Sequence, residues 1–195
     1  MRNEIEEKLE EAKKVIEKGG LVVFPTETAY GIATDATDTD AVEKVYEAKE
    51  RPRSKGLTAI VDSLETAEKY AKLSEKERMI VEEFMPGPLT LVAEKRDNVP
   101  DNLNSGFAFR ISSGKVANRL AEIGPITATS ANISGEETAY SIEDISDELL
   151  DATDFVIDVG KLDSGPTSTI VEFTDGELVV HREGPIKKQE IEKVL

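Results

Sequence analysis

Short apolar runs that alternate with helix-like segments constrain the fold of this chain more than any other feature. Apolar residues recur at helical spacing over residues 5–16, and Gly19-Gly20 stops that segment. The run Leu21–Phe24 follows at once and is closed by Pro25, which is typical of a buried strand. The first 25 residues therefore predict a helix followed by a strand.

The same alternation continues along the rest of the chain. We predict helices over 5–16, 41–46, 74–84, 115–123, 141–150 and 187–195. Predicted strands cover 21–24, 57–61, 89–93, 107–111, 126–128, 155–159, 169–173 and 178–180. Asp175-Gly176 joins the last two strands in a hairpin. Helix-separated strands together with a hairpin predict one α/β domain over residues 1–195, with a twisted mixed sheet of parallel and antiparallel strands and flanking helices.

Composition removes several classes of chemistry. The chain has no cysteine, so disulfides, thiolate metal sites and cysteine nucleophiles are excluded. His181 is the one histidine, which rules out a His-based metal cluster and disfavours a Ser-His-Asp triad. The charged N-terminal residues lack the apolar run of a signal peptide, and no apolar stretch approaches the roughly 18 residues needed to span a bilayer. We therefore expect a cytoplasmic location and no contact with a membrane.

The charge balance singles out one loop. A net charge of −16 argues against broad binding to DNA or RNA, which depends on phosphate neutralisation. Against this background, basic residues gather in one short segment: Lys49, Arg51, Arg53 and Lys55. This loop could bind a phosphate group, because guanidinium groups match phosphate oxygens. A solvated helix C-terminus explains the same residues equally well.

Three further loops offer hydroxyl groups. Pro25–Gly31 directly follows a buried strand, where open α/β sheets bind ligands, although a turn bonded through threonine side chains is the favoured explanation. Thr127–Gly135 and Ser164–Thr169 are rich in small residues whose backbone N–H groups can hold an anion, or they are plain connections. The phosphate-binding pattern G-x-x-x-x-G-K-[ST] is absent, as are G-x-S-x-G and G-x-G-x-x-G.

Taken together, these loops resemble one family, the YrdC-like L-threonylcarbamoyladenylate synthases, in its short single-domain branch. The matching stretches lie in the family's order between residues 19 and 184: GGLVVFPTETAYGI, AVEKVYEAKERP, FMPGPLTLV, FAFRIS, GPITATSANISG and SGPTSTIVEF…VVHREG. The resemblance implies a twisted α/β fold with a concave, positively lined surface. It also implies a nucleotidyltransferase that converts L-threonine, bicarbonate and ATP to threonylcarbamoyl-AMP and pyrophosphate. The product serves the threonylcarbamoyladenosine modification at position 37 of ANN-decoding tRNAs.

The resemblance also implies site residues. Lys49 and Arg51 would be catalytic. Threonine would be bound by Thr28, Arg110, Ser130 and Ser168, and ATP by Arg51, Lys55, Asn132 and Arg182. No protein-held metal is implied; Mg2+ would arrive with ATP. The implied partners are the three substrates and the machinery that transfers the threonylcarbamoyl group to tRNA, with a weak direct contact to RNA as a further option.

The sequence departs from the family pattern at two places. Ile60 replaces a histidine of longer family members, and Thr138-Ala139-Tyr140 replaces a Ser-Pro-Thr, so the roles of Ile60 and Tyr140 are open. Glu27 is one option for the base that deprotonates threonine.

The main alternative function is an RNA-binding module of the same fold without synthase activity. A carbamoyl-transfer domain of a hydrogenase-maturation protein is disfavoured, because that domain normally accompanies zinc-binding cysteines.

Overall fold

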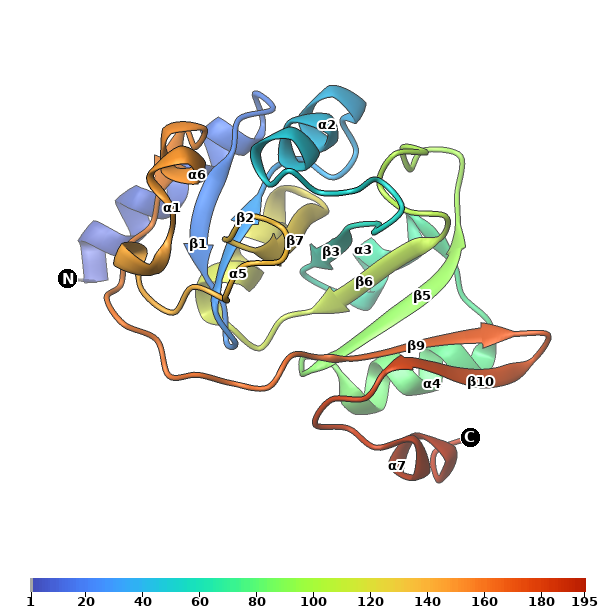
Figure 1. Ribbon diagram of the computed structural model, residues 1–195. Helices are drawn as coiled ribbons and strands as arrows, with labels where there is room; N and C mark the ends of the chain where they lie inside the picture. Colours follow the sequence, from blue (N-terminus) through green and yellow to red (C-terminus); the bar gives the residue numbers. More distant parts are fainter. Residues whose placement is uncertain (1) are drawn as a thin grey trace.

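The computed structural model describes residues 2–195, and the strands of this part form one twisted sheet with helices packed against it (Figure 1). The helices are α1 (Arg2–Ile16), α2 (Thr39–Ala48), α3 (Leu64–Glu68), α4 (Glu75–Phe84), α5 (Lys115–Leu120), α6 (Asp147–Asp151) and α7 (Lys188–Glu192), with 3-10 turns at Ala121–Ile123 and Ile142–Asp144. The strands are β1 (Val22–Pro25), β2 (Tyr30–Ala33), β3 (Thr58–Val61), β4 (Ala71–Lys72), β5 (Leu89–Lys95), β6 (Phe107–Ile111), β7 (Ile126–Ser130), β8 (Phe155–Val156), β9 (Thr169–Thr174) and β10 (Glu177–Arg182).

The sheet is mixed, as the sequence predicts. Its strand order is β10-β9-β5-β6-β3-β7-β2-β1-β8, with β4 paired to β5 off this path. Strands β1 and β8, β3 and β6, and β5 and β9 pair in parallel, whereas the other neighbours are antiparallel. The hairpin between β9 and β10 turns at Asp175 and Gly176, both with positive φ (53° and 81°), which confirms the predicted turn.

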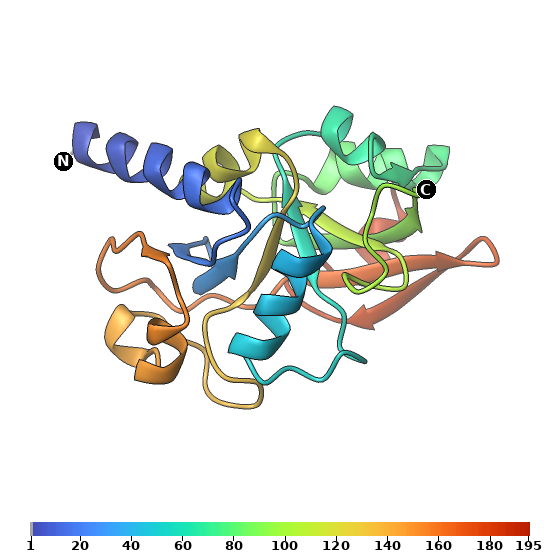
Figure 2. The same cartoon turned by 90° about the horizontal axis from the view of Figure 1, so that it is seen from above.

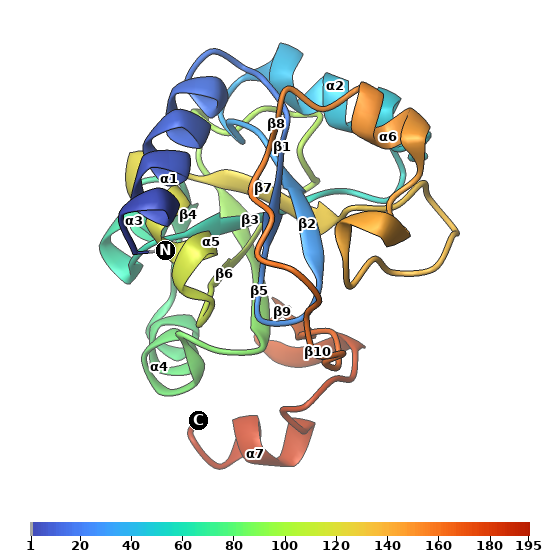
Figure 3. The same ribbon diagram turned by 90° about the vertical axis from the view of Figure 1, so that its left-hand side faces the viewer.

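The long N-terminal helix is held by its apolar stripe. Leu9, Ala12 and Ile16 are buried at helical spacing, and α1 contacts α5 and β1. Figure 3 shows α1 beside α5 along β1, and Figure 2 shows α1 and the β9–β10 hairpin at opposite ends of the molecule. A capping box starts α4: Ser74 Oγ accepts from the backbone N–H of Glu77, and the Glu77 carboxylate accepts from the backbone N–H of Ser74.

Two apolar clusters form the core. The smaller one joins α1 and α5 to one face of the sheet and contains Phe24, Ile60 and Ile126. The larger one includes Tyr46 of α2 and the stacked rings of Phe107 and Phe109, whose centroids are 5.5 Å apart. Ile60 is fully buried in the smaller cluster, so its role is packing.

Several predicted elements differ from the structure. Tyr30–Ala33, expected in part to be loop, is strand β2 between β1 and β7. The helix predicted over 141–150 is broken, because Ile145 is extended and Ser146 starts α6 as its N-cap. The strand predicted over 155–159 stops at Val156, because the Asp158 carboxylate accepts from the Gly160 N–H and turns the chain. The short elements α3 and β4 were not predicted.

No helix within residues 2–195 is both long enough and apolar enough to cross a bilayer.

Candidate active site

A pocket of about 320 Å³ opens over one face of the sheet. The strand register pairs Thr58 with Ala128 and Thr90 with Ile170, and paired residues point to the same face. All four residues line the pocket. Farther along β3 and β7, Ile60 and Ile126 lie on the same face beneath α5. One end of this face is therefore covered by helices, and the other is left open as the pocket floor.

The loop between β1 and β2 forms one wall. Thr26 Oγ1 accepts from the backbone N–H groups of Thr28 (3.1 Å) and Ala29 (3.2 Å) and donates to the Ala29 carbonyl (2.7 Å). The turn bonded through threonine side chains is therefore real, and it also places Thr28 in the pocket lining. The hydrogen-bonded turn therefore also forms part of the pocket wall.

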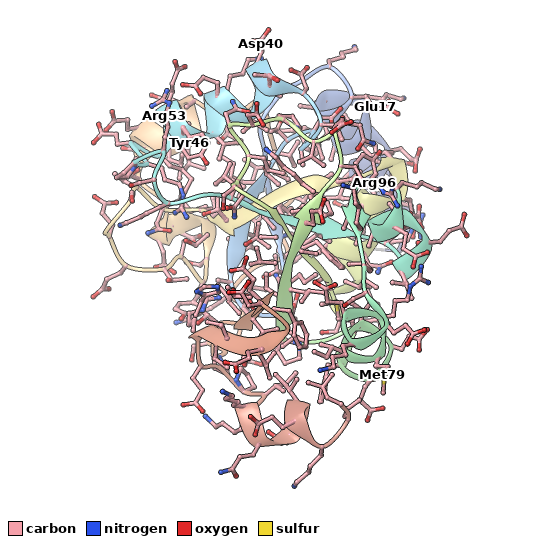
Figure 4. All side chains as sticks on the ribbon, turned by 90° about the vertical axis from the view of Figure 1, so that its right-hand side faces the viewer. Glu17, Asp40, Tyr46, Arg53, Met79 and Arg96 are labelled. Atoms are coloured by element: carbon pink, nitrogen blue, oxygen red, sulfur yellow. The ribbon has the colours of Figure 1, made fainter. Side chains whose placement is uncertain are left out.

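The basic loop after α2 divides into buried and exposed residues. Arg51 lines the pocket, and its guanidinium donates to the carbonyls of Lys55 (2.6 Å) and Gly56 (2.9 Å). Lys55 is exposed. Arg53 pairs with Glu43 and lies over the Tyr46 ring, 5.7 Å from its centroid, on the outer surface (Figure 4). One arginine of the loop thus faces the pocket while another faces solvent.

Two more arginines, from β6 and β10, line the pocket. Arg110 projects from β6, and Arg182 ends β10, where its Nε and Nη2 donate to the carbonyl (2.9 Å) and hydroxyl (3.1 Å) of Ser168. Burial lowers the pKa of Arg51, Arg110 and Arg182, and Arg110 lowers that of Arg182 further. Three guanidinium groups with reduced solvation favour an anionic ligand between them.

Lys49 lies behind the pocket. Its side chain is 1% exposed, and its ammonium donates to the carbonyl oxygens of Ser130 and of Asn132, the latter at 2.5 Å. Burial, and then Arg51, lower the pKa of Lys49 to about 7. Lys49 therefore holds the loop after β7 in place from beneath and does not line the pocket.

Asn132 has a similar place inside this loop. Its Nδ2 donates to the carbonyls of Ile133 and Glu136, both at 2.9 Å, and its Oδ1 accepts from the Ser130 hydroxyl. The side chain is 8% exposed and is fully used in shaping the loop. Ser130, in contrast, lines the pocket.

The structure thus separates the predicted site residues into two groups. Six line one pocket: Thr28, Arg51, Arg110, Ser130, Ser168 and Arg182. Three do not: Lys49, Lys55 and Asn132. Contact of any of them with a substrate stays a prediction.

The pocket also contains residues that sequence reasoning missed. Thr90 bonds to Ser168 through their hydroxyl oxygens, 2.9 Å apart. Asn104 reaches the pocket past Gly56, where any Cβ would lie 2.5 Å from the Asn104 amide carbon. Tyr140, whose role was open, also lines the pocket, and its carbonyl accepts from Leu162 N (2.7 Å) in the coil that leads to β9. Strand alternation could have identified Thr90, but Asn104 carries no pattern of its own.

No carboxylate lines this pocket, and within residues 2–195 no cluster of His, Cys, Asp or Glu has the size needed to hold a metal ion.

Comparison with known proteins assigns the chain to a family. The Sua5/YciO/YrdC family model, described as "Telomere recombination", matches residues 14–184. This chain belongs to the Sua5/YciO/YrdC family. It is 38% identical over 192 residues to a Methanocaldococcus jannaschii protein with the provisional name threonylcarbamoyl-AMP synthase, covering 97% of this chain and 92% of that one.

The family includes longer proteins as well. The threonylcarbamoyl-AMP synthase of Pyrococcus abyssi is 38% identical over 202 residues, and the match spans all of this chain but 59% of that protein. The crystal structure of P. abyssi Sua5 complexed with L-threonine superposes with a TM-score of 0.89 at 37% identity, covering 96% of this chain and 57% of that one. These matches confirm the predicted family and fold.

Proposed function

We propose that this protein is an L-threonylcarbamoyl-AMP synthase, a nucleotidyltransferase that forms threonylcarbamoyl-AMP and pyrophosphate from L-threonine, bicarbonate and ATP. One observation carries the proposal: three arginines line the same pocket as the predicted hydroxyl residues. The arginines are Arg51, Arg110 and Arg182, and the hydroxyl residues are Thr28, Ser130 and Ser168. The names of the relatives and the threonine complex of P. abyssi Sua5 support an enzyme with this substrate.

The pocket suits a reaction between two anions. In the proposed reaction the threonine nitrogen attacks the carbon of CO2 released from bicarbonate and loses a proton, which gives a carbamate. A carbamate oxygen then attacks the α-phosphorus of ATP, the bond to the bridging α–β oxygen breaks, and pyrophosphate leaves with that electron pair. The protein's part is to align the two anions and to neutralise the charge that develops.

The arrangement of side chains suggests how these tasks are divided. Arg110, with Thr28, Ser130 and Ser168, would bind the amino acid, because a guanidinium pairs with a carboxylate in two parallel bonds. Arg51 and Arg182 would face the phosphates. Lys49 would support Ser130 from beneath the pocket, and its catalytic role is retained as a prediction. Contacts of Lys55 and Asn132 with ATP are retained as predictions.

Magnesium would be bound by the phosphate oxygens of ATP, because the pocket lining holds no carboxylate. When bound there it would neutralise phosphate charge. The product is a mixed anhydride of a carbamic and a phosphoric acid, so it would be consumed by a transferase; we propose the tRNA threonylcarbamoyl-transfer machinery of the cytoplasm.

The test is an assay of pyrophosphate release with ATP, bicarbonate and each amino acid in turn. We expect release with threonine, and a rate with serine about 10- to 200-fold lower, because one methyl group contributes only about 1–3 kcal/mol. Release that does not depend on threonine would refute the proposal. Salt-sensitive RNA binding without ATP consumption would favour the rival RNA-binding module.

A further inference from the structure

A half-buried carboxylate beside the pocket has no place in the reaction as described so far. Glu27 precedes Thr28 in the wall formed by the β1–β2 loop, and its side chain is 17% exposed. Its Oε1 accepts from Nη1 of Arg110, and its Oε2 accepts from the Ser112 hydroxyl at 2.5 Å. Both carboxylate oxygens are therefore engaged by neighbours on and just after β6.

The Ser112 hydroxyl is itself held in orientation. Ser112 is 1% exposed, and its Oγ accepts from the backbone N–H of Gly114 at 3.1 Å. Since this bond occupies a lone pair of Oγ, the hydroxyl hydrogen is free to point to Glu27. A Cβ added at Gly114 would lie 3.1 Å from both the backbone nitrogen and Oε2 of Glu27, so any other residue there would require Glu27 to shift slightly. The contacts form a continuous chain from Gly114 through Ser112 and Glu27 to Arg110.

Arg110 needs a counter-ion, and the Glu27 carboxylate supplies it. It is 7% exposed, and burial lowers its pKa while Glu27 opposes that effect. Arg182 shares the pocket and is of like charge. A buried guanidinium without a counter-ion is costly and would turn toward solvent, whereas a carboxylate bond on one edge leaves its other N–H donors aimed elsewhere.

We propose that Glu27, held by Ser112, is a positioning residue that orients Arg110 to receive the carboxylate of the amino-acid substrate. This inference rests on the proposed function and deepens it. It also answers the earlier question of whether Glu27 is the base that deprotonates threonine. A base needs a free oxygen facing the substrate, but Glu27 is not part of the pocket lining and both its oxygens are bonded.

The two roles predict different kinetics for Glu27→Gln. The amide keeps the shape of the carboxylate but removes the charge that holds Arg110. We expect the KM for threonine to rise about tenfold or more, the KM for ATP to stay within about twofold, and the pH profile of kcat to keep its shape. A base role predicts instead a large fall in kcat with loss of the acidic limb of the profile, and that result would overturn the inference.

A second substitution tests the rest of the chain of contacts. Ser112→Ala keeps the charge of Glu27 but removes its second bond, so we expect a smaller rise in the KM for threonine, about threefold. The matched control is Ser113→Ala, which removes the neighbouring exposed hydroxyl and should leave both KM values unchanged. Glu122→Gln, an exposed carboxylate paired with Lys13 and Arg119, is the control for loss of an ion pair elsewhere.

A double-mutant cycle distinguishes positioning from a general structural effect. If Glu27 acts through Arg110, Glu27→Gln should raise the KM for threonine in the wild type but hardly at all in an Arg110→Lys background. Equal effects in both backgrounds would refute the inference. Should Glu27→Gln fail to fold, as judged by circular dichroism, Ser112→Ala in the same two backgrounds gives the same test.

The wild-type assay separates the two proposals. If the wild type releases pyrophosphate with threonine and Glu27→Gln leaves the KM for threonine unchanged, the positioning role falls while the function stands. If the wild type releases no pyrophosphate with threonine, both the proposed function and this inference are refuted.

Discussion

The Lys49 ammonium donates a hydrogen bond to the main-chain carbonyl of Asn132, 2.5 Å away and 83 positions further along the chain. A second bond goes to the carbonyl of Ser130. In return, Ser134 N donates to the Lys49 carbonyl at 2.8 Å. The end of α2 and the loop after β7 are thus joined from both sides, which fixes one wall of the pocket.

Replacing Lys49 with methionine should loosen this wall. The variant fills most of the same volume but leaves two buried carbonyl groups without their donor, so we expect a loss of about 1–3 kcal/mol in the free energy of unfolding. The rate of threonine-dependent pyrophosphate release should fall as well, because Ser130 shifts. Urea denaturation and the pyrophosphate assay measure the two effects. Wild-type stability in this variant would contradict the supporting role of Lys49.

The same side chain should make stability depend on pH. The pKa of Lys49 is about 7 in the fold, below its ordinary value of 10.5. Between these values the unfolded chain binds more protons, so the free energy of unfolding should increase as pH rises from about 7 to about 10.5, by up to about 1.4 kcal/mol per pH unit. The Lys49→Met variant should lack this contribution. Urea denaturation of both proteins across this range provides the test, and parallel curves would refute it.

Arg51 and Arg53 form a matched pair for testing the pocket. Arg51→Ala removes a guanidinium from the lining, and we expect the rate of pyrophosphate release to fall about 10²- to 10³-fold, as for other groups that stabilise developing charge. Arg53→Ala removes an arginine that lies over Tyr46 outside the pocket and should change the rate by less than about twofold. Both proteins should show wild-type circular dichroism. Equal effects would mean that the phosphates lie elsewhere.

The N-terminal cap of α4 should contribute to stability but not to catalysis. Ser74→Ala removes the hydroxyl that accepts from the Glu77 N–H, and we expect a loss of about 1 kcal/mol in the free energy of unfolding. Neither Ser74 nor Glu77 lines the active-site pocket, so kcat and both KM values should stay unchanged. A kinetic effect would show that α4 communicates with the pocket.

Elements with a strong local pattern could be predicted from the sequence, and short ones could not. The run Phe107–Ile111 appears as β6 with the predicted bounds, because five buried residues in succession leave few alternatives. Strand β2 was missed in part because Tyr30-Gly31 looks like loop, and only its pairing with β1 and β7 makes it a strand.

Six of the predicted residues line the pocket, but the contacts that the basic loop makes could not be predicted from the sequence. The sequence could not decide whether Lys49–Lys55 is a phosphate site or a solvated helix end; in the structure Arg51 lines the pocket and Lys55 is exposed to solvent. The supporting contacts of Lys49 were not predicted because its partners are backbone carbonyls, which no sequence pattern marks. Glu27 was visible as a carboxylate, but its engagement with Arg110 depends on the packing of distant segments.

Part of the pocket floor is built from alternating residues of a strand, such as Ala108 and Arg110 of β6, and this has a consequence for how the protein can change. An inserted or deleted residue within β3, β6 or β7 would reverse the facing of all positions beyond it, which would bring core residues into the pocket and send pocket residues into the core. Length changes between relatives should therefore fall in the connecting loops, while the floor can change only by substitution in place.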